Sequence, residues 1–363
     1  MLSRKKEKIN YRRTEGDTIP KVLMRTIERY GHKKAAIRYK NLGIWEKYTW
    51  QDLHDKVKYF AFGLMSLGFK PRDVLCTVGD NEPELVFARY AAMAMGGVIS
   101  GAYQTGLPEE LKHQVDLADV TIMVVEDQEQ VDKLIEMWDE LKGIRKVIYY
   151  DPKGLPNYTE DYLLYFPDVQ EMGRKFDEKN PGWWEARVAK GKEEDLCILS
   201  TTSGTTGNPK LAMLTHKNLL SMGKNLMSFD PIEQGDEFVS FLPLAWIGEQ
   251  MMSLACGLQV GFTINFPEEP ETVQHDIREI GPQAMFSPPR IWENMISQVQ
   301  VKIEDSTKLK QNMYEWALKI GYEMADMRFR KETPTFGVKA KHWLADWTVF
   351  QEIKDQLGLR HLK

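Results

Sequence analysis

Residues 199–218 read LSTTSGTTGNPKLAMLTHKN and continue the apolar run LCIL of residues 196–199. Their first twelve positions hold six hydroxyl side chains, two glycines and a lysine. Glycines let backbone N–H groups turn inward around an anion, hydroxyls add neutral donors, and a lysine adds a mobile positive charge. The stretch therefore predicts an ordered loop that binds a chain of phosphates. The residues predicted to bind it are Thr202, Ser203, Gly204, Thr205, Thr206, Gly207 and Lys210.

Two other interpretations of this loop fit less well. A P-loop NTPase needs four residues between its glycines and a lysine directly after the second glycine. Here two residues separate Gly204 from Gly207, and Lys210 follows three positions later. A flexible Ser/Thr/Gly linker is the other alternative, but linkers rarely lie between two predicted core strands. We therefore expect the loop at the carboxyl end of the strand LCILS, where ligands bind in open α/β sheets.

Strand and helix patterns alternate along most of the chain. Residues 49–68 place an apolar stripe on one helical face, with Thr49 and Asp52 spaced as a capping box and Gly68 as a left-handed cap. Alternation of this kind is typical of a doubly wound, mainly parallel sheet. The strands we expect span residues 74–78, 98–103, 121–127, 146–150, 196–200, 211–214, 238–243, 262–266 and 283–287.

Residues 151–192 interrupt the alternation with Pro, Gly, Tyr and charged residues, which indicates a boundary. We expect two stacked, doubly wound α/β subdomains after a basic N-terminal extension, residues 1–17. The first subdomain, with its connecting segment, spans residues 18–192. The second, residues 193–363, carries the phosphate loop.

Composition excludes several classes of protein. The formal net charge of −5 at pH 7 provides no basic field for nucleic acid. The basic run RKKEKINYRR, residues 4–13, has no apolar face, so it favours a solvated tail over an anionic-membrane contact. Cys76, Cys197 and Cys256 lie far apart in apolar surroundings, which predicts buried thiols in a reducing compartment. With no signal-peptide or bilayer-spanning pattern, we expect a cytoplasmic protein.

The loop LSTTSGTTGNPK resembles the signature loop of the adenylate-forming superfamily, which includes acyl-CoA synthetases, luciferases and peptide adenylation domains. The blocks GIWEKYTWQDL, GGVISGAYQT, FVSFLPLAWIGEQ and SPPRIWENM are similar, in order, to the long-chain acyl-CoA synthetase branch. The likeness covers nearly the whole chain. It implies the N-terminal domain fold of that superfamily, with ATP, Mg²⁺ and coenzyme A as cofactor and co-substrates and a fatty acid as the partner.

The resemblance also implies a two-step ligase reaction. A fatty carboxylate attacks the α-phosphorus of ATP, pyrophosphate leaves, and the thiol of coenzyme A then displaces AMP. Charge builds on the pyrophosphate, so donors fixed around it stabilise the transition state more than the ground state. Lys210 and Thr206 are the catalytic candidates, Thr205 and Thr206 the contacts to phosphate or Mg²⁺, and Thr202 and Ser203 shape the loop.

Two further residues have alternative roles, and a third has a single expected role. Where many relatives carry a histidine after LPLA, this chain has Trp246, which either fills the core or lines the acyl tunnel as a substrate contact. His216 is expected to be a helix N-terminal residue. Arg290 either binds an anion at the start of its helix or forms a surface ion pair.

The resemblance places four more features after the phosphate loop. These are a glycine-rich adenine-binding turn, a Tyr-Gly-x-Thr-Glu segment with a magnesium-binding glutamate, a ribose-binding aspartate, and a mobile domain with a catalytic lysine. None of them occurs in the 363 residues. We therefore expect the N-terminal part of a longer enzyme, truncated at its C-terminus. Alone it would be inactive or nearly so, with weak, magnesium-dependent affinity for triphosphate.

Residues 308–363 contain two predicted helices, the second with Trp343, Trp347, Phe350 and Ile353 at helical spacing. Core packing is the favoured interpretation of this stripe, and peripheral contact with the inner membrane face is the alternative. We predict an ATP-dependent long-chain fatty acid–CoA ligase. The alternatives are a non-catalytic nucleotide- or acyl-binding module and a phosphotransfer protein outside this superfamily.

Overall fold

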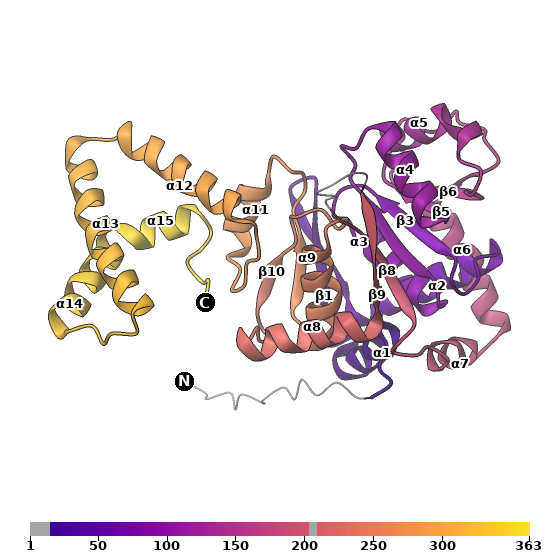
Figure 1. Ribbon diagram of the computed structural model, residues 1–363, viewed down its shortest axis with the longest axis horizontal. Coiled ribbons are helices and arrows are strands. Elements are labelled where there is room, and N and C mark those ends of the chain that lie inside the picture. Colours follow the sequence, from indigo (N-terminus) through magenta and orange to yellow (C-terminus); the bar gives the residue numbers. More distant parts are fainter. Residues whose placement is uncertain (1–14, 203–208) are drawn as a thin grey trace. The chain divides into compact units, whose positions relative to one another are not determined.

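The computed structural model describes residues 15–202 and 209–363. The chain forms two compact units, Met1–Glu269 and Pro270–Lys363 (Figure 1). All the strands of the described residues belong to the first unit, and the second consists of helices and their connections. No helix in this described part of the chain combines the length and the apolar character that crossing a bilayer requires.

The larger sheet of the first unit has seven strands, and six of them run parallel. The last strand, β9, is antiparallel to its neighbour β8. Every residue of β3 and β4 is buried, as expected for central parallel strands that are covered on both faces. In sheet order the strands are β7 (Leu163–Tyr165), β6 (Lys146–Tyr149), β5 (Val120–Val125), β3 (Val74–Val78), β4 (Val98–Ala102), β8 (Leu196–Thr202) and β9 (Lys210–Thr215).

The smaller sheet has four strands and joins distant parts of the chain. The first strand, β1, pairs in parallel with β11, with Ile37 opposite Ile264, and forms an antiparallel hairpin with β2. In sheet order the strands are β10 (Glu237–Val239), β11 (Thr263–Phe266), β1 (Ala35–Asn41) and β2 (Ile44–Thr49).

The boundary that we predicted at residue 192 does not coincide with a division of the sheets. β8 follows that boundary but pairs with β4, while β1 precedes it but pairs with β11. Figure 1 shows this exchange, since strands of different colour lie side by side in the first unit. The Pro- and Gly-rich segment is a connection within one unit that carries β7 and two helices. Residues 270–363, which we assigned to a second α/β subdomain, are helical instead.

The local signals for the helices are confirmed. Asp52 N–H donates to Thr49 Oγ1 over 3.2 Å and Thr49 N–H donates to Asp52 Oδ2 over 2.8 Å, which completes the capping box of α2. Gly68 has a φ of +81°, a backbone conformation that favours glycine. The helices of the first unit are α1 (Ile19–Tyr30), α2 (Trp50–Ser66), α3 (Pro83–Ala94), α4 (Pro108–Ala118), α5 (Gln128–Glu136), α6 (Phe166–Lys179), α7 (Trp183–Ala189), α8 (His216–Phe229), α9 (Ile247–Gln250) and α10 (Gly257–Val260).

Short helical segments complete the first unit. A π-helical turn, η3 (Met251–Cys256), joins α9 to α10, and 3₁₀ turns lie at Gly31–Lys33 and Trp138–Glu140. The three cysteines are buried with free thiols, as predicted. The basic run of residues 4–13 lies outside the described residues.

The second unit contains α11 (Val273–Ile280), α12 (Pro289–Glu304), α13 (Lys308–Phe329), α14 (Phe336–Ala345), a π-helical turn η4 (Asp346–Phe350) and α15 (Gln351–Gln356). The strand that we predicted over residues 283–287 is not formed, and only an isolated bridge occurs at Ala284. A strand needs a partner for its backbone groups along its length, and an apolar run does not supply one.

The core of the second unit shows which residues of the predicted aromatic stripe are buried. Ala317, Ile320, Ala345 and Val349 form a buried cluster, and Phe350 and Ile353 pack against it. Trp343 and Trp347 instead remain 68% and 64% exposed. Core packing is therefore confirmed for Phe350 and Ile353 and wrong for Trp343 and Trp347. The π-helical turn η4 between them has more residues per turn than an α-helix, so the regular spacing read from the sequence does not keep the four residues on one face.

Candidate functional site

The predicted phosphate loop connects two antiparallel strands. Thr202, at the end of β8, pairs with Lys210, at the start of β9, and Thr202 Oγ1 donates to the Lys210 carbonyl over 3.2 Å. Both residues are exposed, so their side chains are open to a ligand. Ser203, Gly204, Thr205, Thr206 and Gly207 lie outside the described residues, and their roles stay predictions.

The position of this hairpin in the sheet agrees with the prediction. β8 runs parallel to β4, with Ile99 opposite Ile198 and Ser100 opposite Leu199. The chain therefore leaves β8 at the same edge where β4 and β3 end. In parallel sheets this carboxyl edge is where ligands bind.

A segment from the smaller sheet reaches the same edge. Asn81, three residues beyond β3, donates through Nδ2 to the carbonyls of Ser240 and Leu242 over 3.2 and 2.7 Å. Its Oδ1 accepts the backbone N–H of Leu244 over 3.0 Å. Asn81 thus holds the FLPLAW segment, which follows β10, against the end of β3. The carboxyl ends of the two sheets meet at this side chain.

Trp246 lies within the segment that Asn81 holds. It precedes the first residue of α9, it is half-buried, and its backbone N–H donates to the Pro243 carbonyl over 2.8 Å. The half-buried ring is compatible with either of its predicted roles, so its contact with an acyl chain stays a prediction.

A buried carboxyl group lies one helical turn beyond Trp246. Glu249 Oε1 accepts from Ser240 Oγ over 2.6 Å and from Ser253 Oγ over 2.5 Å, while Oε2 has no partner among the described residues. Burial raises the pKa of Glu249 to about 7, although the two serine hydroxyls favour the charged form. The group can therefore change protonation near neutral pH beside the Asn81 contact.

A buried cation lies near Ala245 of the FLPLAW segment. Arg89, on α3, is 1% exposed and donates through Nη2 to Thr77 Oγ1, but Nε and Nη1 have no acceptor within residues 15–202 and 209–363. A Cβ on Gly101 would lie 2.6 Å from Nη2 and 2.9 Å from the Ala245 Cα, so only glycine leaves room there. Burial lowers the pKa of Arg89 to about 10.

Two cavities open on the larger sheet. One of about 240 Å³ lies at the carboxyl edge and is lined by Asp80, Gln104 and Glu126, and burial raises the pKa of Glu126 to about 7. The other, of about 1040 Å³, extends from the start of β3 and β4 to Lys210 and His216.

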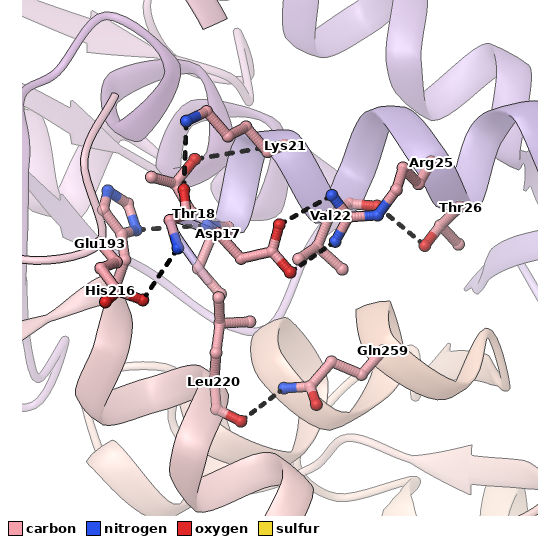
Figure 2. A network of polar contacts seen from close by, with 12 residues as sticks. Asp17, Thr18, Lys21, Val22, Arg25, Thr26, Glu193, His216, Leu220 and Gln259 are labelled. Carbon is pink, nitrogen blue, oxygen red and sulfur yellow. Dashed lines mark hydrogen bonds and ion pairs between the residues drawn. The ribbon is translucent and has the colours of Figure 1, made fainter. Parts of the chain in front are cut away.

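His216 connects the start of α8 to the start of α1. It is the first residue of α8, as predicted, and its Nδ1 accepts the backbone N–H of Ile19 over 3.3 Å. Figure 2 shows this bond together with the paired Asp17 and Arg25, whose atoms lie 2.8 and 2.7 Å apart. Burial lowers the pKa of His216 to about 4, so the ring is neutral at pH 7 and accepts this hydrogen bond.

The sequence around Asn81, Arg89 and Glu249 does not indicate that they belong to the site. Asn81 lies in a turn before a proline, and Arg89 and Glu249 are single charges in apolar helical stretches. A lone charge in such a stretch indicates a buried polar contact but not its partner. Arg290 is exposed in the first turn of α12, and its role stays a prediction.

Comparison with known proteins identifies the family to which the chain belongs. The model of the family described as "AMP-binding enzyme" matches residues 23–332, which is most of the chain. The chain belongs to the AMP-binding enzyme family. Membership excludes the alternative of a phosphotransfer protein outside the adenylate-forming superfamily.

Relatives of this AMP-binding enzyme include long-chain-fatty-acid–CoA ligases. It is 26% identical over 352 residues to ACSBG1 of Rattus norvegicus, an alignment that covers 94% of this chain and 47% of the relative. It is 27% identical over 349 residues to ACSBG2 of Homo sapiens, covering 95% of this chain and 51% of the relative. The chain thus spans about half the length of these relatives.

Solved structures confirm the fold of this AMP-binding enzyme. The adenylation and carrier didomain of a carboxylic acid reductase from Segniliparus rugosus, in complex with AMP, superposes with a TM-score of 0.63. Its sequence is 17% identical, and the match covers 82% of this chain and 47% of that one. The chain therefore has the mixed α/β fold, with parallel sheets, of the N-terminal domain of adenylate-forming enzymes.

Proposed function

We propose that this chain forms the phosphate- and acyl-binding part of an ATP-dependent long-chain fatty acid–CoA ligase. The observation that carries the proposal is the β8–β9 hairpin, which presents Thr202 and Lys210 at the carboxyl edge of the sheet. The two long-chain-fatty-acid–CoA ligases described above support the class of acid. The residues predicted to bind phosphate are contiguous with this hairpin.

Lys210 would act as a point charge on the departing pyrophosphate. In the first step a fatty carboxylate attacks the α-phosphorus of ATP and the bond to pyrophosphate breaks, so negative charge grows on the leaving group. A lysine at the loop end and hydroxyl donors within the loop stabilise that charge, and this lowers the barrier. In the second step the coenzyme A thiol attacks the acyl carbon and AMP leaves.

Mg²⁺ would add positive charge at the same phosphates. Thr205 and Thr206 are the predicted contacts, but they lie outside the described residues, so this assignment is part of the proposal. Trp246 is proposed as the acyl contact, because it is half-buried where the carboxyl ends of the two sheets meet. The cytoplasm is the proposed location.

The decisive assay is fatty-acid-dependent exchange of pyrophosphate into ATP by the native protein. We expect exchange with a long-chain fatty acid, and a loss of about a hundredfold in Lys210→Ala, as for other single donors to a transition-state anion. Lys33→Ala is the matched control, because Lys33 is also an exposed lysine but lies beyond the end of α1. Exchange only with amino acids or aryl acids would overturn the substrate class. A complete lack of exchange would favour the non-catalytic binding module.

The 363 residues alone are expected to bind triphosphate weakly and to form little or no acyl-CoA. The adenine- and ribose-binding motifs that the resemblance implies do not occur in them, so ATP and GTP should bind with similar affinity. Misplacing the reacting groups costs about a hundredfold or more in rate. Calorimetric titration with ATP, GTP and pyrophosphate, with and without Mg²⁺, tests this. Strong rejection of GTP, or rapid acyl-CoA formation, would contradict it.

A further inference from the structure

The second unit exposes a row of large aromatic side chains. Phe336, Trp343 and Trp347 are 88%, 68% and 64% exposed. Their spacing of seven and then four residues puts them on one side of α14 and the following π-helical turn. We call these three residues the aromatic face. Phe329, which is 90% exposed, ends the preceding helix α13.

The aromatic face is not the side that holds the second unit together. Ala345 and Val349 occupy the opposite side of the same helical segment, where they are buried with Ala317 and Ile320 of α13. The helix is therefore already anchored by its small and aliphatic side. Water contact with large aromatic rings is unfavourable, so a contiguous exposed set of them indicates a binding surface.

The chemistry of the aromatic face favours a lipid surface. The rings of Trp343 and Trp347 are nearly parallel, with an interplanar angle of 5° and centroids 6.5 Å apart. Tryptophan combines an apolar ring with an N–H donor, and it is enriched where apolar chains meet hydrated headgroups. A stacked pair beside a phenylalanine presents a broad, shallow apolar surface that suits this boundary.

Basic residues flank the aromatic face along the chain. Five exposed basic residues lie in this part of the unit: Arg328 in the last turn of α13, Arg330 and Lys331 on the connection to α14, and Lys339 and Lys341 on α14. Lys339 lies one helical turn before Trp343, on the side of the aromatic face, whereas Lys341 lies one turn before Ala345, on the opposite side. The two acidic residues between Arg328 and Trp347 are Glu332 and Asp346, which pair with Arg330 and Lys354. This local excess of positive charge contrasts with the net charge of −5 for the whole chain. It complements an anionic surface.

We propose that the aromatic face and the basic residues around it bind the surface of a bilayer that contains anionic phospholipid. The rings would lie at the level of the headgroups and the basic side chains would contact lipid phosphates, an arrangement typical of interfacial helices. The segment lies on the membrane and does not cross it. The proposal does not depend on the ligase function, because none of these residues belongs to the nucleotide site.

The test is co-sedimentation of the purified 363-residue chain with two kinds of vesicle. One kind contains phosphatidylcholine alone, and the other contains phosphatidylcholine and phosphatidylglycerol in equal parts. We expect the chain to bind the mixed vesicles about tenfold or more tightly than the neutral ones, with a blue shift of tryptophan fluorescence. Binding should weaken from about 0.1 M to 1 M salt, because the screening length falls from about 10 to 3 Å.

Two double variants separate the contributions. Trp343→Ser with Trp347→Ser, and Lys331→Glu with Lys339→Glu, should each lose about tenfold or more in affinity for mixed vesicles. Trp316→Ser is the matched control, because Trp316 lies on α13 in the same unit, is 40% exposed and is outside the aromatic face. It should bind as the unaltered chain does. Circular dichroism checks that each variant is folded.

Three results would overturn the proposal. The first is an unaltered chain that does not bind mixed vesicles. The second is unchanged binding in both folded double variants. The third is a lipid-free dimer, seen by light scattering, that Trp343→Ser with Trp347→Ser abolishes, because the face would then join two copies of the chain. None of these three results requires a loss of pyrophosphate exchange. Failure of the membrane proposal can therefore be distinguished from failure of the ligase proposal.

Discussion

Protonation of His216 should weaken the first unit in acid. The buried ring accepts the Ile19 N–H, and a charged imidazolium would lose this acceptor while remaining desolvated. The informative variant is His216→Asn, because the asparagine amide oxygen can accept a hydrogen bond near the Nδ1 position and does not titrate. The variant therefore removes the pH dependence and keeps an acceptor.

The size of the effect follows from the lowered pKa. Burial moves the pKa of His216 from 6.5 to about 4, so below pH 6.5 the unfolded chain takes up a proton that the folded chain does not. Its contribution to stability is complete above pH 6.5 and falls by about 1.4 kcal/mol per pH unit as the pH drops toward 4. Between pH 7.5 and pH 5 the loss is about 2 kcal/mol.

Urea unfolding at pH 7.5, 6 and 5 measures this loss of stability. The unfolding signal should come from a probe in the first unit, because the two units can unfold separately. We expect the free energy of unfolding of the native sequence to fall by about 2 kcal/mol more than that of His216→Asn over this range. Other titrating groups are common to both proteins and cancel in the difference. Parallel curves for the two proteins would refute the reasoning, since they would mean that His216 has an ordinary pKa.

Three further predictions concern the carboxyl edge. Burial raises the pKa of Glu249 from 4.5 to about 7, so its contribution to stability is complete below pH 4.5 and is lost as the pH rises through 7. Glu249→Gln should therefore gain about 2–3 kcal/mol relative to the native sequence between pH 5 and pH 8 in thermal unfolding, and an equal difference at both pH values would argue against it. Asn81→Ala should cost about 3 kcal/mol and reduce pyrophosphate exchange, because it leaves the Leu244 N–H without its acceptor. Asn41→Ala, on an exposed hairpin, is the control and should change neither quantity. Arg89→Met should be neutral or stabilising by about 1–4 kcal/mol, because it replaces a buried charge, whose acceptor among the described residues is the neutral Thr77 hydroxyl, with an apolar side chain of similar length. A large loss of stability in Arg89→Met would contradict this expectation.

The features that could be predicted from the sequence are those with local causes. The capping box at Thr49 and Asp52 acts within one helical turn, and the run VLCTV is apolar because β3 is buried on both faces. The position of Lys210 at the carboxyl edge also follows from a local order of strand, loop and strand. Each of these signals lies within a few residues of the structure that it predicts.

The features that could not be predicted depend on partners far away in the chain. Nothing near Ile37 indicates that it pairs with Ile264, and the contact of Asn81 with Ser240 joins residues 159 positions apart. Trp343 and Ile353 share one helical pattern, but only the position of α13 decides which side of it is buried. A periodicity indicates that a helix has faces without indicating which face has a neighbour.

The pairing of β1 with β11 affects how the protein must be synthesised. The strands β1 and β2 leave the ribosome early, but the edge of β1 finds its partner only after residues 263–266 have been made. At translation rates of about 5–20 residues per second, the N-terminal hairpin waits for roughly ten seconds or more with an open edge. The hydrogen bond from Thr26 Oγ1 to the carbonyl of Leu258 likewise cannot form until Leu258, 232 residues later, has been made. During that interval the nascent chain offers an unpaired strand to any neighbour, so its yield in cells should depend on chaperones that cover such edges.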